Sequence, residues 1–418
     1  MRIGYYAHHH GSGHCRQADK LAALLPSELR QRMTVFTSLP NDAYHFSTIT
    51  DEQIVRLSAE DELPDDVLPG RAGKYWQPNS LHYSPVGNED IQKRSWQLLD
   101  AIYQRQIDLM IVDVSVEVAM LCRTASVPYL YVRLAGERDD MPHLNAFAGA
   151  LGLLAPYPKA LEAAATPDWV RQKTLYLDFL PNKAQSLPSF SEFIDKLMTL
   201  SENGATKQQL CSHASADKAI YDHDKANPQT SVKTHIATVI KGYGGHEAID
   251  AKLPELRQLL PDAIIVSLGP INEEVRHCVD IAAHVDDVTP FIAYSNLLLM
   301  ACGLNGIAQV YDYATPLVVL PDVRPHREQE VMAEALIERG RALSWAQFMA
   351  QTSHMDSQNG TSFLSMSDKT ISNEQAALTD HQTNQAAQNF MDSIADYISV
   401  NAWFQEWLLP QLGLKPEK

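Results

Sequence analysis

The chain has 418 residues and a formal charge of −17, because 51 acidic residues outnumber 34 basic ones. Hydrophobic residues make up 45% of the sequence, which is enough for folded cores and excludes a wholly disordered chain. The length predicts two or three domains. The acidity argues against a nucleic-acid-binding protein, since such proteins need clustered Lys and Arg to displace counterions.

Five cysteines lie far apart, and no C-x-x-C occurs. Their odd number and spacing argue against a disulfide scaffold or structural zinc, and favour a reducing, cytoplasmic location. The apolar run near the N-terminus is too short for a signal peptide. The longest apolar stretch, Leu297 to Leu304, is far shorter than the ~20 residues that a membrane span requires.

Short apolar runs alternate with helical patterns in the first half of the chain. Apolar positions at helical spacing follow the first run, with Pro26 closing that helix, and two more helices are predicted at Asn88–Gln106 and Val116–Thr124. In the helix at Asn88–Gln106 the recurring residues are Ile91, Trp96, Leu99 and Tyr103. Strands are predicted at Arg2–Ala7, Met33–Thr37, Gln53–Leu57, Asp108–Val112 and Val127–Val132. This order indicates right-handed βαβ crossovers and a parallel sheet.

The second half repeats the pattern, beginning with a strand and a glycine-rich loop. Strands are predicted at His235–Ile240, Ala263–Ser267, Leu297–Ala301 and Pro316–Leu320, with helical patterns between them. We therefore expect an α/β protein with two Rossmann-like domains, whose parallel sheets face a central cleft.

Two polar stretches interrupt this plan. The predicted organisation is an N-terminal Rossmann-like domain at 1–181, a polar linker or insertion at 182–233, a C-terminal Rossmann-like domain at 234–350, a polar segment at 351–388 and a terminal helix at 389–418. Trp403, Trp407 and Leu408 give that last segment an apolar pattern, which predicts that it packs back on the body of the protein.

The loop Gly11-Ser12-Gly13 follows the first strand, where backbone N–H groups can approach an anion. A dinucleotide fingerprint would need a third glycine where Arg16 stands and an acid after the second strand, which ends at Thr37-Ser38 without one. An NAD-dependent enzyme is therefore disfavoured, and the absence of G-x-x-x-x-G-K-[ST] disfavours a P-loop NTPase. A simple tight turn is the alternative.

Four histidines, His8, His9, His10 and His14, surround this loop. No carboxylate or cysteine stands nearby at a recognised zinc spacing, so no metal site is predicted. A histidine at the carboxyl end of a parallel strand is better interpreted as a general base, because its ordinary pKa lies near neutrality. The alternative is a histidine that only bonds the backbone at a helix start.

The residues His8 to Ala18, H-H-H-G-S-G-H-C-R-Q-A, resemble the first glycine loop of GT-B glycosyltransferases. The similarity is to the peptidoglycan lipid-intermediate N-acetylglucosaminyltransferase and to related glycolipid and macrolide enzymes. The resemblance implies that His14 is catalytic and that the acceptor-side loop consists of His10, Gly11, Ser12 and Gly13. Asp113, at a strand end, would orient the histidine, or would merely cap the strand.

The stretch from His284 to Leu343 is similar to the donor-binding region of the same family in order and spacing. It has an apolar stretch, a glycine-opened helix, T-P with an apolar strand, and then E-Q. The resemblance implies donor contacts at Gly244, Gly245, Val288, Gly303, Leu304, Asn305, Gly306, Glu328 and Gln329. The family usually has a Glu that holds the ribose where this chain has Gln309, and an amide lacks the charge-assisted strength of a carboxylate.

The resemblance thus implies a metal-independent, inverting glycosyltransferase of the hexosyltransferase type. It would use a nucleotide-sugar as co-substrate, with UDP-sugar favoured, and no other cofactor. The acceptor would be a hydroxyl compound of unknown identity, with a lipid-linked one as an option, and peripheral membrane association stays open. The alternatives are a nucleotide-sugar 2-epimerase on the same fold and a catalytically silent nucleotide-sugar-binding protein.

Overall fold

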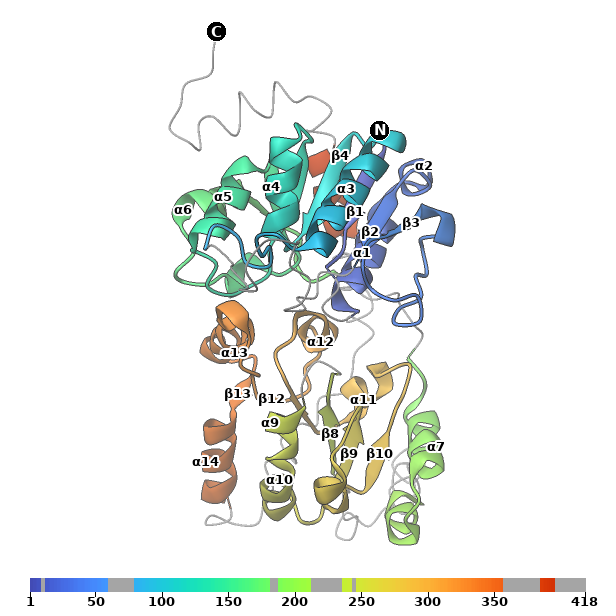
Figure 1. Cartoon of the computed structure of the whole chain (residues 1–418). Coiled ribbons are helices and arrows are strands. Elements are labelled where there is room, and N and C mark those ends of the chain that lie inside the picture. Colours follow the sequence, from blue (N-terminus) through green and yellow to red (C-terminus); the bar gives the residue numbers. More distant parts are fainter. Residues whose placement is uncertain are drawn as a thin grey trace. The chain divides into compact units, whose positions relative to one another are not determined.

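The computed structural model describes residues 1–8, 12–58, 79–180, 187–211, 235–242, 246–355 and 384–394. It divides the chain into two compact units (Figure 1). Unit 1 comprises Met1–Asn182 and Leu378–Lys418, and unit 2 comprises Lys183–Ala377. Each unit is an α/β body with its own parallel sheet, which confirms the predicted fold class of two α/β domains.

Unit 1 has a seven-stranded sheet in the order β3-β2-β1-β4-β5-β6-β7, and all its strand pairs are parallel. The strands are β1 Ile3–Tyr6, β2 Thr34–Thr37, β3 Ile54–Arg56, β4 Leu109–Asp113, β5 Tyr129–Val132, β6 Gly152–Ala155 and β7 Thr174–Tyr176. The first five coincide with the predicted strands, and the last two were not predicted. Reversal of the strand order between β1 and β4 places the carboxyl ends of these two strands side by side, where α/β sheets commonly bind ligands.

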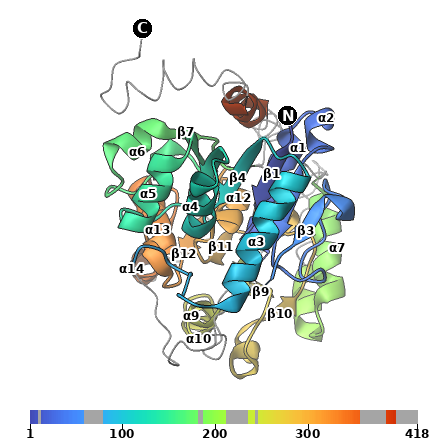
Figure 2. The same cartoon turned by 45° about the horizontal axis from the view of Figure 1, so that its top comes forward.

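The helices of unit 1 cover both faces of this sheet. They are α1 Gly13–Leu24, α2 Ser27–Arg30, α3 Glu89–Gln104, α4 Val116–Thr124, α5 Met141–Gly149 and α6 Asp168–Lys173. One face, here called the α1 face, buries Tyr5 and Ile111 against α1. The other, the α3 face, buries Tyr6 and Val112. Helices α3, α4 and α5 cover this face (Figure 2).

Helix α3 forms where it is predicted, but it buries other residues than the pattern suggests. Trp96 and Tyr103 are 65% and 80% exposed, whereas Arg94, Leu98 and Ile102 are buried at i, i+4 and i+8. The guanidinium of Arg94 donates to the Tyr6 hydroxyl inside the α3 face, so a buried cation occupies a place in the apolar stripe. A hydrophobic pattern assigns aromatic residues to the core and cannot anticipate this hydrogen bond.

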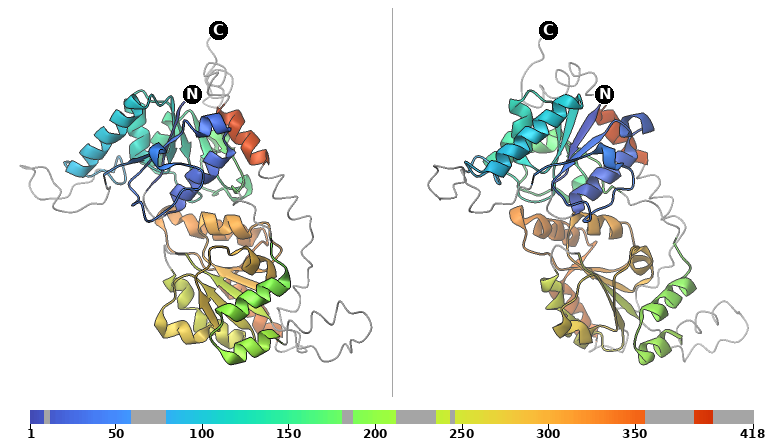
Figure 3. Two further views of the ribbon diagram at one scale, coloured as in Figure 1. Left: turned by 90° about the vertical axis from the view of Figure 1, so that its right-hand side faces the viewer. Right: turned by 45° about the vertical axis from the view of Figure 1, so that its right-hand side comes forward.

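The end of the described chain returns to unit 1. A helix at 384–394, red in Figure 3, buries Ala386, Phe390 and Ile394 in the core of the α1 face. The terminal helix predicted at 389–418 overlaps this helix at residues 389–394, while 395–418, with both tryptophans named above, lies outside the described residues. The predicted polar segment begins inside a helix, α14 Trp345–Met355.

Unit 2 has a six-stranded parallel sheet in the order β10-β9-β8-β11-β12-β13. Its strands are β8 Ile236–Ile240, β9 Ile264–Leu268, β10 Ile281–Ala283, β11 Leu297–Met300, β12 Leu317–Val319 and β13 Leu343–Ser344. Its other helices are α7 Phe190–Leu200, α9 Glu247–Asp250, α10 Leu253–Leu259, α11 Thr289–Tyr294, α12 Leu304–Val310 and α13 Glu328–Glu338. Strands β8, β9, β11 and β12 match the predicted ones, and short β10 and β13 escaped prediction.

Part of the predicted linker at 182–233 is helix α7, which is a structural part of unit 2. Ser189 caps it through a capping box with Glu192, and Phe193, Ile194 and Leu197 pack into the core beside α11. The polar composition of the whole segment conceals an apolar stripe that needs only three buried side chains.

All five cysteines are free thiols, and only Cys211 is exposed. In the part of the chain that the structure describes, no helix has both the length and the apolarity needed to cross a membrane.

Candidate functional site

The central side chains of unit 1 are Asp113, at the carboxyl end of β4, and His14, in the helix that follows the neighbouring strand β1. Because side chains alternate along β4, Asp113 shares the α1 face with Ile111. His14 stands in the first turn of α1 on that same face. Its Nδ1 lies 3.0 Å from Asp113 Oδ2, with the carboxylate wholly buried and the histidine side chain 17% exposed. The fold therefore brings together the histidine and the strand-end carboxylate that the sequence analysis suggested would orient it.

A third residue, Tyr5, completes this arrangement. Its hydroxyl donates to the same Asp113 Oδ2 at 2.9 Å. Burial, together with the negative charge of Asp113, raises the pKa of Tyr5 well above its ordinary value, so the hydroxyl keeps its proton. Tyr5 pairs with Ile111 in the sheet, and alternation along β4 therefore puts it on the face of Asp113, but the sequence alone does not show this pairing.

The hydrogen bonds fix the tautomer of His14. A carboxylate only accepts hydrogen bonds, so the proton of a neutral His14 ring belongs on Nδ1, which donates to Asp113. Nε2 is then the basic nitrogen. A buried carboxylate behind a partly exposed imidazole is the arrangement that general bases use, because it orients the ring and stabilises the imidazolium formed on proton uptake.

The backbone after Asp113 is strained. Val114 has φ +68°, and Ser115 N–H donates back to the Asp113 carbonyl at 2.9 Å, which makes a γ-turn. A positive φ is costly for a β-branched residue. The Val114 backbone is held on both sides, by its N–H to Val132 O at 3.2 Å and by the Tyr131 hydroxyl, which donates to its carbonyl. The turn directs the Asp113 side chain toward α1 and places Ser115 at the N-cap of α4.

The rest of the predicted acceptor-side loop is only partly described. Ser12 caps α1 through its carbonyl, which accepts from Arg16 N–H at 3.0 Å, and Gly13 is the first residue of the helix. His10 and Gly11 lie outside the described residues. His8, at the end of β1, is buried, and its ring centroid lies 5.7 Å from that of His14.

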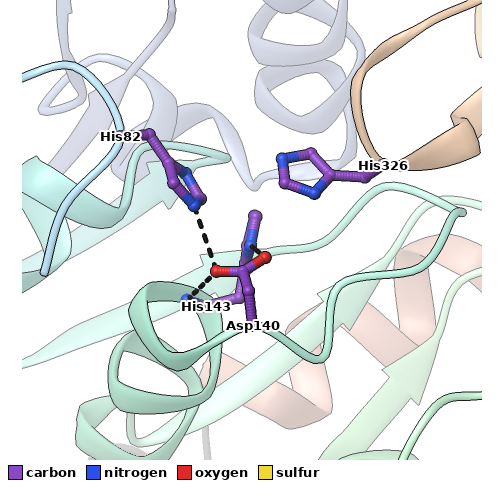
Figure 4. Close-up of side chains that lie close together, drawn as sticks. All are labelled: His82, Asp140, His143 and His326. Carbon is purple, nitrogen blue, oxygen red and sulfur yellow. Dashed lines mark hydrogen bonds and ion pairs between the residues drawn. The ribbon is translucent and has the colours of Figure 1, made fainter. Parts of the chain in front are cut away.

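Unit 1 also holds a second group of histidines around a carboxylate, shown in Figure 4. Asp140 caps α5, accepts from His143 Nδ1 at 2.6 Å and pairs with His82 Nε2 at 3.0 Å. Burial opposes the ionisation of Asp140, but these two histidines outweigh it and lower its pKa to about 2. Sequence reasoning did not find this group, because its members come from distant segments.

Nitrogen and oxygen atoms of this kind can hold a transition metal, but the surroundings of His143 favour a different role. The Arg138 guanidinium lies 3.1 Å from His143 Nε2 and can only donate, so the histidine proton belongs on Nδ1. A metal on Nδ1 would move that proton to Nε2, against the guanidinium. We interpret the group as a hydrogen-bonded connection between the segment at 79–88 and α5.

A cavity of about 230 Å³ lies in unit 1 beside α3 and α4. Its lining is mainly apolar: Leu81, Tyr83, Ser84, Ile91, Arg94, Ser95, Leu98, Glu117, Val118, Met120, Leu121 and Thr124. Glu117 accepts the N–H groups of His82 and Tyr83 and so fixes the loop that borders it. The Tyr83 and His8 ring centroids are 6.1 Å apart, which connects the cavity wall to the neighbourhood of His14.

In unit 2, the predicted donor turn lies between β11 and α12. Gly303 caps α12, and its carbonyl accepts from the N–H groups of Gly306 and Ile307 at 3.0 Å each. A side chain at Gly303 would meet nothing within 4 Å, so this turn is open to close approach. A Cβ at Gly306 would lie 2.7 Å from Met300 Cε, so this glycine allows the helix to pack on β11. Leu304 and Asn305 form the first turn between them.

The other predicted donor residues have structural partners. Gln329 is buried, and its side-chain oxygen accepts from Cys302 N–H at 3.1 Å and Asp322 N–H at 3.0 Å, so it joins the loops after β11 and β12. Gln309 Nε2 donates to Asn305 O at 3.0 Å along its own helix.

Val288 caps α11, and its carbonyl accepts from Ile292 N–H. Glu328 opens α13 after two residues with positive φ, His326 and Arg327. Gly244 and Gly245 lie outside the described residues, so the predicted first loop of this unit has no structural description.

Comparisons with solved structures establish the fold of the chain. No protein-family model and no curated protein matches the sequence. Among solved structures, the chain is similar to MurG of Acinetobacter baumannii at 12% identity and a TM-score of 0.53, covering 95% of this chain and all of that one. The spinosyn forosaminyltransferase SpnP matches at 11% identity and a TM-score of 0.55, covering 96% and 99% of the two chains. The spinosyn rhamnosyltransferase SpnG, complexed with thymidine diphosphate, matches at 14% and 0.51, covering 95% and 96%. The chain has the GT-B fold of these glycosyltransferases.

Proposed function

We propose that the protein is a glycosyltransferase that moves a sugar from a nucleoside-diphosphate sugar to a hydroxyl acceptor, with His14 as the general base. The observation that carries the proposal is the pair formed by His14 Nδ1 and the buried Asp113 carboxylate. The shared fold with glycosyltransferases of known structure supports it, and so does the open glycine turn before α12.

The acceptor hydroxyl would lie against His14 Nε2. As its oxygen attacks the anomeric carbon, the hydroxyl proton passes to Nε2, and Asp113 stabilises the imidazolium. The new carbon–oxygen bond forms on the face opposite the breaking bond, whose electron pair leaves with the nucleoside diphosphate. The sugar is therefore transferred with inversion, and the reaction needs no metal ligand set in this mechanism.

The donor would be bound by unit 2. Backbone N–H groups at the Gly303 to Gly306 turn would meet the diphosphate, Gln309 the ribose and Glu328 the sugar. The backbone of Val288 would contact the nucleobase, and Gly244 with Gly245 would approach the phosphates. We assign Gln329 the role of holding the loops after β11 and β12 together, because its oxygen is bonded to both.

The nucleobase of the donor and the chemistry of the acceptor are part of this proposal. SpnG binds thymidine diphosphate, so TDP-sugars stand beside the UDP-sugars that the sequence resemblance favours. The apolar cavity at Tyr83 suits an acceptor with an apolar part, of which a lipid-linked compound is one kind. The cytoplasmic location and any peripheral association with membranes stay predictions.

The test combines donor binding with turnover. Thermal unfolding is measured with UDP-, GDP- and TDP-sugars, and the sugar that raises the midpoint is then incubated with hydroxyl acceptors, among them macrolide aglycones, while nucleoside diphosphate release is followed. We expect a shift and acceptor-dependent release. A shift without release would favour a silent binding protein, and conversion of the sugar without acceptor would favour the epimerase. No shift with any donor would contradict the donor site.

A further inference from the structure

We propose that Tyr5 is a positioning residue for His14: its hydroxyl holds the Asp113 carboxylate in place and, by sharing its negative charge, keeps His14 less basic than Asp113 alone would make it. The proposal rests on the proposed role of His14 as a base. Its test, however, reads the titration of His14 directly and does not depend on turnover.

The two donors meet at one oxygen. Tyr5 Oη and His14 Nδ1 lie 2.9 and 3.0 Å from Asp113 Oδ2, whereas Asp113 Oδ1 is buried and has no hydrogen-bond partner among the described residues. The polar stabilisation of this carboxylate therefore comes chiefly through Oδ2. In a buried site each hydrogen bond carries more electrostatic weight than in water, so a proton donated by Tyr5 withdraws charge that would otherwise stabilise the His14 imidazolium.

The carboxylate has a second, independent support. The γ-turn at Val114 is fixed by Tyr131 and by Val132, which belong to β5, and neither bond involves Tyr5. Loss of the Tyr5 hydroxyl should therefore leave Asp113 at its place beside His14. The carboxylate would then keep its full charge for the imidazolium, and the pKa of His14 would rise.

Other ionisable groups also lie near His14. They include His8, whose ring centroid is 5.7 Å away, and Cys15 and Arg16 on α1. Burial raises the pKa of Cys15 to about 11, so its thiol is neutral at physiological pH. Arg16 is exposed, where solvent screens its charge. Among the residues described, Asp113 is thus the buried charge in direct contact with His14, and Tyr5 is the donor that shares it.

The experiment is a titration of the histidine Cε1–H resonances by NMR in the full chain, with the His14 signal assigned from its absence in His14→Gln. In Tyr5→Phe we expect the pKa of His14 to rise by about 0.5 to 1 unit. The matched control is Tyr6→Phe, which removes a hydroxyl from the next residue of β1, on the opposite face, where it accepts from Arg94. This control should leave the His14 pKa unchanged.

An unchanged or lower pKa in Tyr5→Phe, or an equal rise in Tyr6→Phe, would overturn the proposal. Site-specific 3-fluorotyrosine at position 5, which keeps the ring and donates more strongly, should shift the pKa downward and serves if Tyr5→Phe folds poorly. If the enzyme turns over, the acidic limb of its pH profile for kcat/KM should move with the titration. A shifted titration without any turnover would support Tyr5 and contradict the proposed function.

Discussion

The end of β4 in unit 1 and the end of β11 in unit 2 occupy equivalent places in two parallel sheets, yet they are built differently. At β4 a buried carboxylate is paired with an imidazole and a phenol, and the backbone beside it is strained. At β11 the turn consists of glycine and backbone, and a neutral amide, Gln329, joins it to the neighbouring loop. A buried charge needs polar partners within the protein. The turn before α12, which is proposed to bind an anionic ligand, carries no charge of its own and presents backbone N–H groups.

The largest effect should come from removing the base. We expect His14→Ala to lower kcat by about 10²- to 10⁴-fold, because proton removal from the acceptor contributes that much in general-base catalysis. Binding of the donor, measured by calorimetry, should change little, since unit 2 is proposed to bind it. His45→Ala, which removes an exposed histidine of the same unit, is the control. A His14→Ala enzyme with normal kcat would show that unit 1 does not supply the base.

In unit 2 the expected effect is on stability. Gln329→Ala leaves the N–H groups of Cys302 and Asp322 without their acceptor, and we expect a loss of about 2 to 4 kcal/mol in the free energy of unfolding. Urea denaturation measures it.

The control for this substitution is Gln347→Ala. Gln347 is exposed, and its oxygen accepts one N–H, that of Ser344, for which water can substitute. We expect a loss of at most about 0.5 kcal/mol there. If Gln329→Ala were as stable as Gln347→Ala and instead bound the donor weakly, the residue would act on the ligand directly, as the sequence resemblance implies.

The smallest effect should come from relieving the strain beside Asp113. Glycine tolerates the φ of +68° at position 114, so Val114→Gly should not lower the thermal midpoint. The looser turn should nevertheless reduce kcat, by roughly tenfold, because it holds Asp113 less firmly toward His14.

Ser126→Gly is the matched control for Val114→Gly. Ser126 also has a positive φ, +59°, but it is exposed and follows the end of α4. Glycine there should leave kcat unchanged while relieving similar strain. Equal kcat in both variants would mean that the strained turn serves the chain path only.

The sequence determined most of the sheet in each unit. Buried parallel strands are continuous apolar runs, so β1, β2, β4, β5, β8 and β9 can be recognised without a structure. The register of β1 against β4, which puts Tyr5 and Asp113 on one face, comes only from the folded chain. The shortest strands, such as β13, carry too few residues to give a pattern. The face of α3 that packs on the sheet was not predicted, because Arg94 is buried in the core through its hydrogen bond to Tyr6.

What the tertiary structure decided is which polar atoms meet. The resemblance named His14, and the strand-end position named Asp113, but nothing in their spacing of 99 residues says that they touch. The contacts of Tyr5 with Asp113, of Gln329 with two loops and of His82 with Asp140 arise when strands and helices pack. Apolar burial has a period that a sequence displays, but a hydrogen bond depends on distance and direction between atoms of distant segments, and these exist only in the folded chain.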